Sequence, residues 1–325
     1  MEDFKMYTIG IDLGGTHIAV GLVDENYKIV KKISAPTLAQ RGPEEITKDM
    51  AAISKKICEE CGLDLVRDGI KVGIASPGTV NPKTGLIEYA NNIKMRDFPV
   101  VKLFSEFSGV AEENISIGND ANLAALGEAT SGAAKDAEIA VMITLGTGVG
   151  GGVVIDGKLL TGCAFGGAEL GHMVIEYGGR KCSCGREGCF EAYSSATALV
   201  ALTREKFAQT HSPIVAEMCE NDPMKIGGKT AFAAMRKGCR ASAEVVDYYI
   251  SHLACGIANL INIFQPDVFL IGGGVCNEGD PLLLPLREKV AKEVYSADNT
   301  LKTDIRIATL GNDAGIIGAV ALVRG

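Results

Sequence analysis

A cluster of three cysteines and one histidine is the part of the sequence whose residue types most directly predict chemistry. Cys182, Cys184 and Cys189 lie close together, and His172 comes ten residues before the first of them. Three thiolates and one imidazole form a complete tetrahedral ligand set for a structural Zn²⁺. Glycines interleaved with these residues permit so short a segment to fold back on itself, because glycine adopts positive φ without steric cost.

Two other interpretations of the cluster are a disulfide with one leftover thiol and a chance grouping among the ten cysteines of the chain. No secretory signal precedes the cluster, and cytoplasmic thiols stay reduced, so the sequence favours zinc. His172 can bind zinc through only one ring nitrogen, which leaves the other to donate a hydrogen bond to a neighbouring group. Glu169 and Glu191 flank the cluster and are candidate ligand-binding acids, with ordinary solvated carboxylates as the alternative.

Two stretches of similar pattern predict glycine-rich hairpins. In the first, Asp12-Leu13-Gly14-Gly15-Thr16 separates the apolar runs Tyr7–Ile11 and His17–Val23; in the second, Glu138–Ile155 carries Thr147-Gly148 at its turn. The N–H groups of such turns can hold phosphates, and a carboxylate such as that of Asp12 can hold Mg²⁺ through water. The alternative is ordinary turn chemistry. Their recurrence predicts a duplicated α/β domain whose hairpins converge on one phosphate chain.

The tetrapeptide Gly-Asn-Asp-Ala occurs twice, at Gly118–Ala121 and at Gly311–Ala314. Each copy precedes a predicted helix, and aspartate is a good helix N-cap. The motif alone therefore cannot decide whether Asp120 or Asp313 is a catalytic base.

The remaining pattern predicts an alternation of strands and helices. Polar residues and glycines follow several of the strands, where small ligands commonly bind in α/β folds. The expected elements are a helix over Gly42–Cys61, strands over Ile70–Ala75, Leu86–Tyr89 and Ile115–Ile117, turns at Ser76–Gly78 and Asn91-Asn92, a helix from near Leu123, a helix over Ala241–Phe264, a strand over Val268–Ile271 followed by Gly272–Gly274, and a helix over Ala314–Val323 that packs on the first domain.

The length, composition and net charge of the chain argue against several classes of protein. A chain of 325 residues with 47% hydrophobic residues can form two domains. The net charge of −8, from 32 basic and 40 acidic residues, argues against a nucleic-acid partner. No apolar stretch is long enough to cross a membrane, and a predicted strand begins near Tyr7, which leaves no room for a signal peptide. We therefore expect a cytoplasmic protein without nucleic-acid or membrane partners.

Taken together, the motifs resemble the ROK family of sugar kinases, and among its members the glucokinases. The residues that carry the resemblance are Asp12–Thr16, Gly118–Asn122, Leu145–Gly152, Gly167–His172, Cys182–Glu191 and Gly272–Gly274. The resemblance implies an actin-like ATPase (ribonuclease H-like) fold, with two α/β domains around a cleft and a zinc knuckle. The expected domains are a small one, residues 1–121 completed by 312–325, and a large one, residues 122–311, with the knuckle and a dimerisation surface.

The resemblance also implies transfer of the γ-phosphoryl group of ATP, with Mg²⁺, to the 6-hydroxyl of glucose. Asp120 would be the catalytic base. The expected sugar-binding residues are Gly78, Asn119, Asp120, Glu169, His172 and Glu191. The expected nucleotide-binding residues are Asp12, Gly14, Gly15, Thr16, Thr147, Gly148, Gly273 and Gly274. His172, Cys182, Cys184 and Cys189 would hold zinc, and a homodimer is expected.

Other functions remain open at this point. The same frame suits an N-acetylmannosamine, fructose or allose kinase, and the phosphoryl donor could be polyphosphate. A sugar-responsive repressor would need a DNA-binding module before the first hairpin, where only eleven residues precede Asp12. A filament-forming or chaperone-like ATPase would share the hairpins but has no need of the Cys/His cluster.

Overall fold

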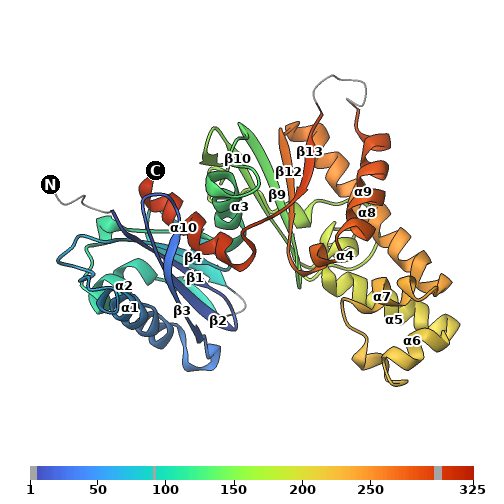
Figure 1. The fold of residues 1–325 in the computed structure, drawn as a ribbon, viewed down its shortest axis with the longest axis horizontal. Helices are drawn as coiled ribbons and strands as arrows, with labels where there is room; N and C mark the ends of the chain where they lie inside the picture. Colours follow the sequence, from blue (N-terminus) through green and yellow to red (C-terminus); the bar gives the residue numbers. More distant parts are fainter. Residues whose placement is uncertain (1–5, 91–92, 296–301) are drawn as a thin grey trace. The chain divides into compact units, whose positions relative to one another are not determined.

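The computed structural model describes residues 6–90, 93–295 and 302–325. By their internal contacts these residues form two compact units (Figure 1). Unit 1 comprises Met1–Glu138, Gly152–Ala168 and Ala308–Gly325, and unit 2 comprises Ile139–Gly151 and Glu169–Ile307. The contact-based grouping assigns residues 122–138 to unit 1. The predicted division into residues 1–121 with 312–325 and residues 122–311 stays a prediction.

Unit 1 is built on a five-stranded sheet with the order β3-β2-β1-β4-β8. Its strands are β1 (Thr8–Leu13), β2 (His17–Val23), β3 (Ile29–Pro36), β4 (Lys71–Ser76) and β8 (Ile115–Asn119). The β1–β2 pair is antiparallel, whereas β4 is parallel to both β1 and β8. The first predicted hairpin is thus confirmed.

Different helices pack on the two faces of this sheet. Ile9 and Ile11 belong to a buried cluster with residues of α1 (Pro43–Glu59) and α2 (Val100–Ser108). On β1, Gly10 lies between them in sequence and its α-carbon approaches α10 (Ala314–Arg324) instead. A Cβ atom at Gly10 would lie 2.3 Å from the carbonyl oxygen of Ile316. The C-terminal helix therefore packs on the sheet of unit 1, as predicted.

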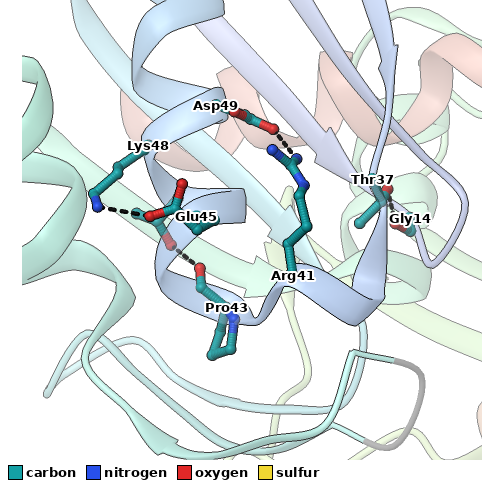
Figure 2. A network of polar contacts seen from close by, with 8 residues as sticks. Gly14, Thr37, Arg41, Pro43, Glu45, Lys48 and Asp49 are labelled. Atoms are coloured by element: carbon teal, nitrogen blue, oxygen red, sulfur yellow. Dashed lines mark hydrogen bonds and ion pairs between the residues drawn. The ribbon is translucent and has the colours of Figure 1, made fainter.

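Polar contacts hold the segment between β3 and α1, residues 37–42, to its neighbours (Figure 2). Thr37 donates its hydroxyl hydrogen to the carbonyl oxygen of Gly14 at 2.6 Å. Nearby, Arg41 forms an ion pair with Asp49 of α1. The turn is therefore supported by a segment that directly precedes α1.

A smaller antiparallel sheet follows β4 in sequence. It consists of β5 (Thr79–Asn81), β6 (Leu86–Ala90) and β7 (Met95–Phe98). Gly78 precedes it with φ of +89°, and a Cβ atom there would lie 2.1 Å from the carbonyl oxygen of Tyr89. Only glycine fits both conditions. The predicted turn at Asn91-Asn92 lies outside the described residues.

A second five-stranded sheet has the order β11-β10-β9-β12-β13. Its strands are β9 (Ile139–Leu145), β10 (Val149–Ile155), β11 (Lys158–Leu159), β12 (Val268–Gly272) and β13 (Asp304–Ile307). Strand β12 is parallel to β9 and β13. Strands β9 and β10 are neighbours joined by the second glycine turn, as predicted.

Most other helices belong to unit 2. They are α4 (Glu191–Ser194), α5 (Ala196–Thr210), α6 (Pro213–Met218), α7 (Thr230–Arg236), α8 (Arg240–Phe264) and α9 (Asp280–Glu293). Helix α8 ends where predicted, with Gln265 at φ of +42°. In unit 1, α3 (Asp120–Ser131) begins at Asp120 rather than near Leu123, because the Asn119 side chain caps it. None of the helices in the described ranges is long and apolar enough to cross a bilayer.

The close approach of α10 to the sheet gives a test of the fold. A Cβ atom at Gly73 would lie 1.9 Å from the carbonyl oxygen of Ala319. We predict that Gly73→Ala lowers the free energy of unfolding by about 1–3 kcal/mol, because the helix must move away from the sheet. Urea unfolding measures this change. Gly228→Ala is the control, because no atom lies within 4 Å of a Cβ built there, and an equal loss in both variants would contradict the prediction.

Candidate active site and metal centre

In unit 1, predicted site residues gather at the carboxyl ends of parallel strands. Asp12 pairs with Ala75 near the ends of β1 and β4, and Ser76 pairs with Asn119 at the ends of β4 and β8. This edge of a parallel sheet is where α/β proteins commonly bind small ligands. The strand register, rather than any local motif, brings Asp12 and Asn119 to one edge.

Asn119 fixes the start of α3 and the turn at Gly78 together. Its Oδ1 accepts hydrogen bonds from the backbone N–H groups of Ala121 at 3.0 Å and Asn122 at 3.1 Å. Its Nδ2 donates to the carbonyl oxygen of Gly78 at 3.0 Å. Asp120 follows as the first residue of α3, where the helix dipole favours a carboxylate. Three residues of the predicted sugar site thus form one local group.

The carboxyl group of Asp12 is strongly perturbed by this environment. Burial, and secondly the charge of Asp120, raise the pKa of Asp12 to about 6. A Cβ atom at Gly315 would lie 2.8 Å from Cγ of Asp12, so the carboxylate lies against the first turn of α10. A divalent cation would relieve the repulsion between Asp12 and Asp120. The residues present therefore suit the predicted Mg²⁺.

The structure distinguishes the twin aspartates that the tetrapeptide could not. Asp313 lies in a 3₁₀ turn before α10, and its Oδ1 accepts a hydrogen bond from Nζ of Lys32 at 2.5 Å. The charge of Asp120 acts instead on Asp12. Asp313 is thus held in a surface ion pair, whereas Asp120 stands among the other predicted site residues.

The first glycine turn uses some of its own polar groups internally. The N–H of Gly14 donates to the carbonyl oxygen of His17 at 2.9 Å, and its carbonyl oxygen accepts from Thr37 (Figure 2). Oγ1 of Thr16 lies 3.2 Å from Nδ1 of His17, and Thr16 is exposed. Gly14 therefore shapes the turn, while Thr16 presents a hydroxyl to solvent.

In unit 2, the predicted metal ligands lie together. The ligand atoms of His172, Cys182, Cys184 and Cys189 all lie within 4.8 Å of one another. Sγ of Cys184 lies 3.7 Å from Sγ of Cys189, and Sγ of Cys182 lies 3.7 Å from Nδ1 of His172. These separations are close to the edge of a tetrahedron with Zn–S bonds of about 2.3 Å, which is about 3.8 Å. A disulfide needs sulfur atoms about 2.05 Å apart, and all ten cysteines are unpaired.

The orientation of His172 defines the role of its second nitrogen. Nδ1 faces the sulfur atoms, so a metal ion bound there would leave the hydrogen on Nε2. The imidazole would then donate a hydrogen bond from Nε2. Glu169 directly precedes the 3₁₀ turn Leu170–His172, and its carbonyl oxygen accepts a hydrogen bond from the N–H of His172 at 3.0 Å. The Glu169 side chain is exposed.

Glu191 joins the metal loop, which we define as residues 172–189, to the second glycine turn. Its Oε1 accepts a hydrogen bond from Oγ of Ser183 at 2.8 Å, and its Oε2 accepts from the N–H of Val149 at 3.0 Å. A Cβ atom at Gly148 would lie 2.2 Å from Oε2, so a side chain at this position would displace the Glu191 carboxylate. Sequence reasoning missed Ser183, whose only signal is its place between two predicted zinc ligands.

Tyr193 and His252 support the metal loop and were also missed. The hydroxyl oxygen of Tyr193 accepts a hydrogen bond from the N–H of Arg180 at 2.7 Å. The ring of Tyr193 stacks on that of His252 of α8, with centroids 4.7 Å apart. Nε2 of His252 lies 3.8 Å from a carboxylate oxygen of Glu176. Aromatic residues on two distant segments gave no local signal of this support.

The predicted nucleotide-binding residues of unit 2 lie at the carboxyl ends of β9 and β12. Thr147 is exposed in the β9–β10 turn. Gly273 has φ of +90°, and a Cβ atom there would lie 2.4 Å from the carbonyl oxygen of Leu145. Gly274 has open space beside it. Backbone at the end of β12 can therefore be approached closely by a flat ligand.

The metal centre gives a direct test. We predict that the purified protein contains about one Zn²⁺ per chain and that Cys184→Ser loses it, because three protein ligands hold zinc less tightly than four. The same variant should have a lower Tm. Elemental analysis and thermal unfolding check both. Cys163→Ser is the matched control, since Cys163 is exposed and outside the cluster; equal zinc contents in both variants would contradict the assignment.

The pKa of Asp12 gives a second test. A raised carboxyl pKa means that the folded state binds the proton more tightly than the unfolded state. Stability of the metal-free protein should therefore fall as pH rises from about 4 to about 6, by about 3 kcal/mol. Asp12→Asn should remove this pH-dependent loss of stability, and at pH 7 the variant should be more stable than the metal-free wild type. Urea unfolding over that pH range measures the difference, and a constant difference at all pH values would refute it.

Comparison with known proteins places these features in a family. The ROK family model matches residues 8–325. A glucokinase of Thermotoga maritima is 39% identical over 324 residues, which cover 98% of each chain. The crystal structure of a ROK family glucokinase from Streptomyces griseus, in complex with glucose and AMPPNP, has a TM-score of 0.81 and 32% identity over 98% of this chain and 99% of that one. An N-acetylmannosamine kinase of Salmonella typhi is 30% identical over 98% of this chain and 99% of its own.

These similarities extend over both units and agree with the α/β architecture and the actin-like ATPase fold expected from the motifs. The chain belongs to the ROK family.

Proposed function

We propose that this protein is a glucokinase, which transfers the γ-phosphoryl group of ATP to the 6-hydroxyl of glucose. The observation that carries the proposal is the end-to-end similarity to glucokinases, one of them solved with glucose and AMPPNP, an ATP analogue. The local geometry of each unit agrees with this reaction. Little covalent chemistry is required of the protein, since phosphoryl transfer depends mainly on positioning and charge stabilisation.

In this proposal, Asp120 is the catalytic base. It accepts the proton of the sugar hydroxyl while that oxygen attacks phosphorus, which requires a contact of about 2.6–3.2 Å. Asn119 and Gly78 bind the sugar beside it. Support comes from the hydrogen bond that holds Asn119 to Gly78 and from the helix start that places Asp120 next to Asn119.

The metal loop supplies the other sugar contacts. Nε2 of His172 donates to a hydroxyl, and Glu169 and Glu191 accept hydrogen bonds from others. His172, Cys182, Cys184 and Cys189 would hold zinc in a structural role, because four protein ligands leave no open position for water or substrate. His172 bound in this way would keep the orientation that points Nε2 away from the sulfur atoms.

The residues proposed for phosphate contact are Gly14, Gly15 and Thr16 in the first glycine turn and Thr147 and Gly148 in the second. Gly273 and Gly274 lie against the adenosine. Asp12 would hold Mg²⁺ through water, and the ion would neutralise phosphate charge. The partners are therefore a hexose and ATP, and we further propose a cytoplasmic homodimer without nucleic-acid partners.

A second candidate substrate is N-acetylmannosamine, favoured by the similarity to kinases for that sugar. Initial rates with glucose, mannose, fructose, allose and N-acetylmannosamine, followed by ADP release, separate the candidates. Repeating the glucose assay with polyphosphate in place of ATP identifies the donor. If kcat/KM is highest with N-acetylmannosamine, that sugar replaces glucose as the proposed substrate.

The twin aspartates allow a matched test of the base. We predict that Asp120→Asn lowers kcat by about 10²–10⁴-fold, the range that general bases contribute, while glucose affinity changes only a few-fold. Asp313→Asn makes the same chemical change in a surface ion pair and should keep kcat within about 2-fold. Steady-state kinetics and glucose titration calorimetry measure both quantities. Loss of kcat in Asp313→Asn with retention in Asp120→Asn would reverse the assignment.

A further inference from the structure

Glu128 is a fully buried carboxylate for which the proposed mechanism has no use. It lies on α3, eight residues after Asp120, and its side chain is 0% exposed. Oε1 accepts a hydrogen bond from the N–H of Leu310 at 2.7 Å. Oε2 accepts from the N–H of Ala133 at 2.8 Å and from Oγ1 of Thr309 at 3.3 Å. All of these partners are uncharged donors.

These partners lie at two places far apart in the sequence. Ala133 follows the end of α3, whereas Thr309 and Leu310 lie in the segment before α10. A Cβ atom at Gly132 would lie 2.1 Å from Oε2, so glycine at this position leaves room for the carboxylate. The site is therefore built around the side chain of Glu128. Such a buried carboxylate is retained only where its hydrogen bonds offset the loss of hydration.

Helices α3 and α10 are neighbours (Figure 1), and they contact each other through glycines. A Cβ atom at Gly127 would lie 2.4 Å from the carbonyl oxygen of Ala314, and one at Gly318 would lie 1.7 Å from that of Leu123. At these two glycines, backbone meets backbone without an intervening side chain. Because close-packed interiors transmit strain, we expect a change at Glu128 to shift α3 relative to α10.

Each of these helices begins beside one of the site carboxylates. Asp120 is the first residue of α3, and Asp12 lies against Gly315 in the first turn of α10. The relative placement of Asp12 and Asp120 thus depends on how α3 crosses α10. Glu128 lies at the end of α3 away from Asp120, next to Gly127, which contacts Ala314 at the start of α10.

We propose that Glu128 is a positioning residue for catalysis, which sets the separation of Asp12 and Asp120 by joining the end of α3 to the segment before α10. The inference rests on the proposed kinase function. It predicts a loss of rate rather than of sugar affinity, because a misplacement of reacting groups by about 1 Å can cost about 10²-fold in rate.

Two substitutions test the inference by different routes. Glu128→Gln keeps the shape but replaces one acceptor oxygen by an NH₂ group, which then faces an N–H or hydroxyl donor. Gly132→Ala keeps the carboxylate and moves it, because its methyl group occupies the place of Oε2. Each should lower kcat by about 10–100-fold with glucose KM within about 3-fold of the wild-type value. The kcat of the double variant should be no lower than that of the more impaired single variant, because both substitutions act on one contact.

Controls separate positioning from general destabilisation. Ile57 is buried in the cluster on the other face of the sheet, with α1. Ile57→Val and Ile57→Ala give a series of lower Tm values against which the Glu128→Gln and Gly132→Ala variants are compared. If Glu128→Gln does not fold, Thr309→Val removes only the longest of the hydrogen bonds and should lower kcat by about 2-fold or more.

The outcomes are distinct. Loss of kcat in the Glu128 and Gly132 variants, with normal kcat in Ile57 variants of equal Tm, supports the inference. If Glu128→Gln folds and has a normal kcat, the inference is overturned and the kinase assignment stays intact. If Glu128→Gln does not fold, a normal kcat in Thr309→Val has the same consequence. Equal losses in Ile57 variants of the same Tm also overturn it. A wild-type protein that phosphorylates no hexose overturns the proposed function, and this inference with it.

Discussion

The carboxylates of Asp12 and Asp120 repel each other at the carboxyl edge of the first sheet. The candidate site of unit 1 depends on this repulsion. Burial and the neighbouring charge raise the pKa of Asp12 to about 6. An acid in this state binds either a proton or a cation readily near neutral pH. In the proposed function, a divalent cation bound beside Asp12 would relieve this repulsion.

Close backbone packing is what permits this arrangement. The carboxylate of Asp12 has room only because Gly315 has no side chain, and α10 reaches the sheet only because Gly10 and Gly73 have none. The last helix of the chain therefore completes a site that begins with its first strand. In unit 2 the same role falls to Gly148, which lets Glu191 reach the second glycine turn from the metal loop. Small residues at these contacts fix the positions of charged ones.

Local pattern predicted much of this structure, and the limits of that prediction have physical causes. The hairpins, α1, α8 and the Cys/His cluster depend on residues close in sequence, and the structure has them where expected. The ion pair that sets Asp313 apart from Asp120 is with Lys32, which is 281 residues from Asp313. Ser183, Tyr193, His252 and Glu128 act through partners on other segments, and a side chain's distant partners leave no trace in its own neighbourhood. Gly315 looked like an ordinary small residue in an apolar helix.

The central claim is that Asp12 and Asp120 are electrostatically coupled in the folded protein. A ¹³C NMR titration of the Asp12 carboxyl carbon, in the wild type and in Asp120→Asn, measures this coupling directly. We predict a pKa of about 6 for Asp12 in the wild type and a lower value in the variant, where one of the two causes of the raised pKa is gone. An Asp12 pKa that is the same in both proteins, whether about 6 or near the ordinary 3.8, would contradict the account.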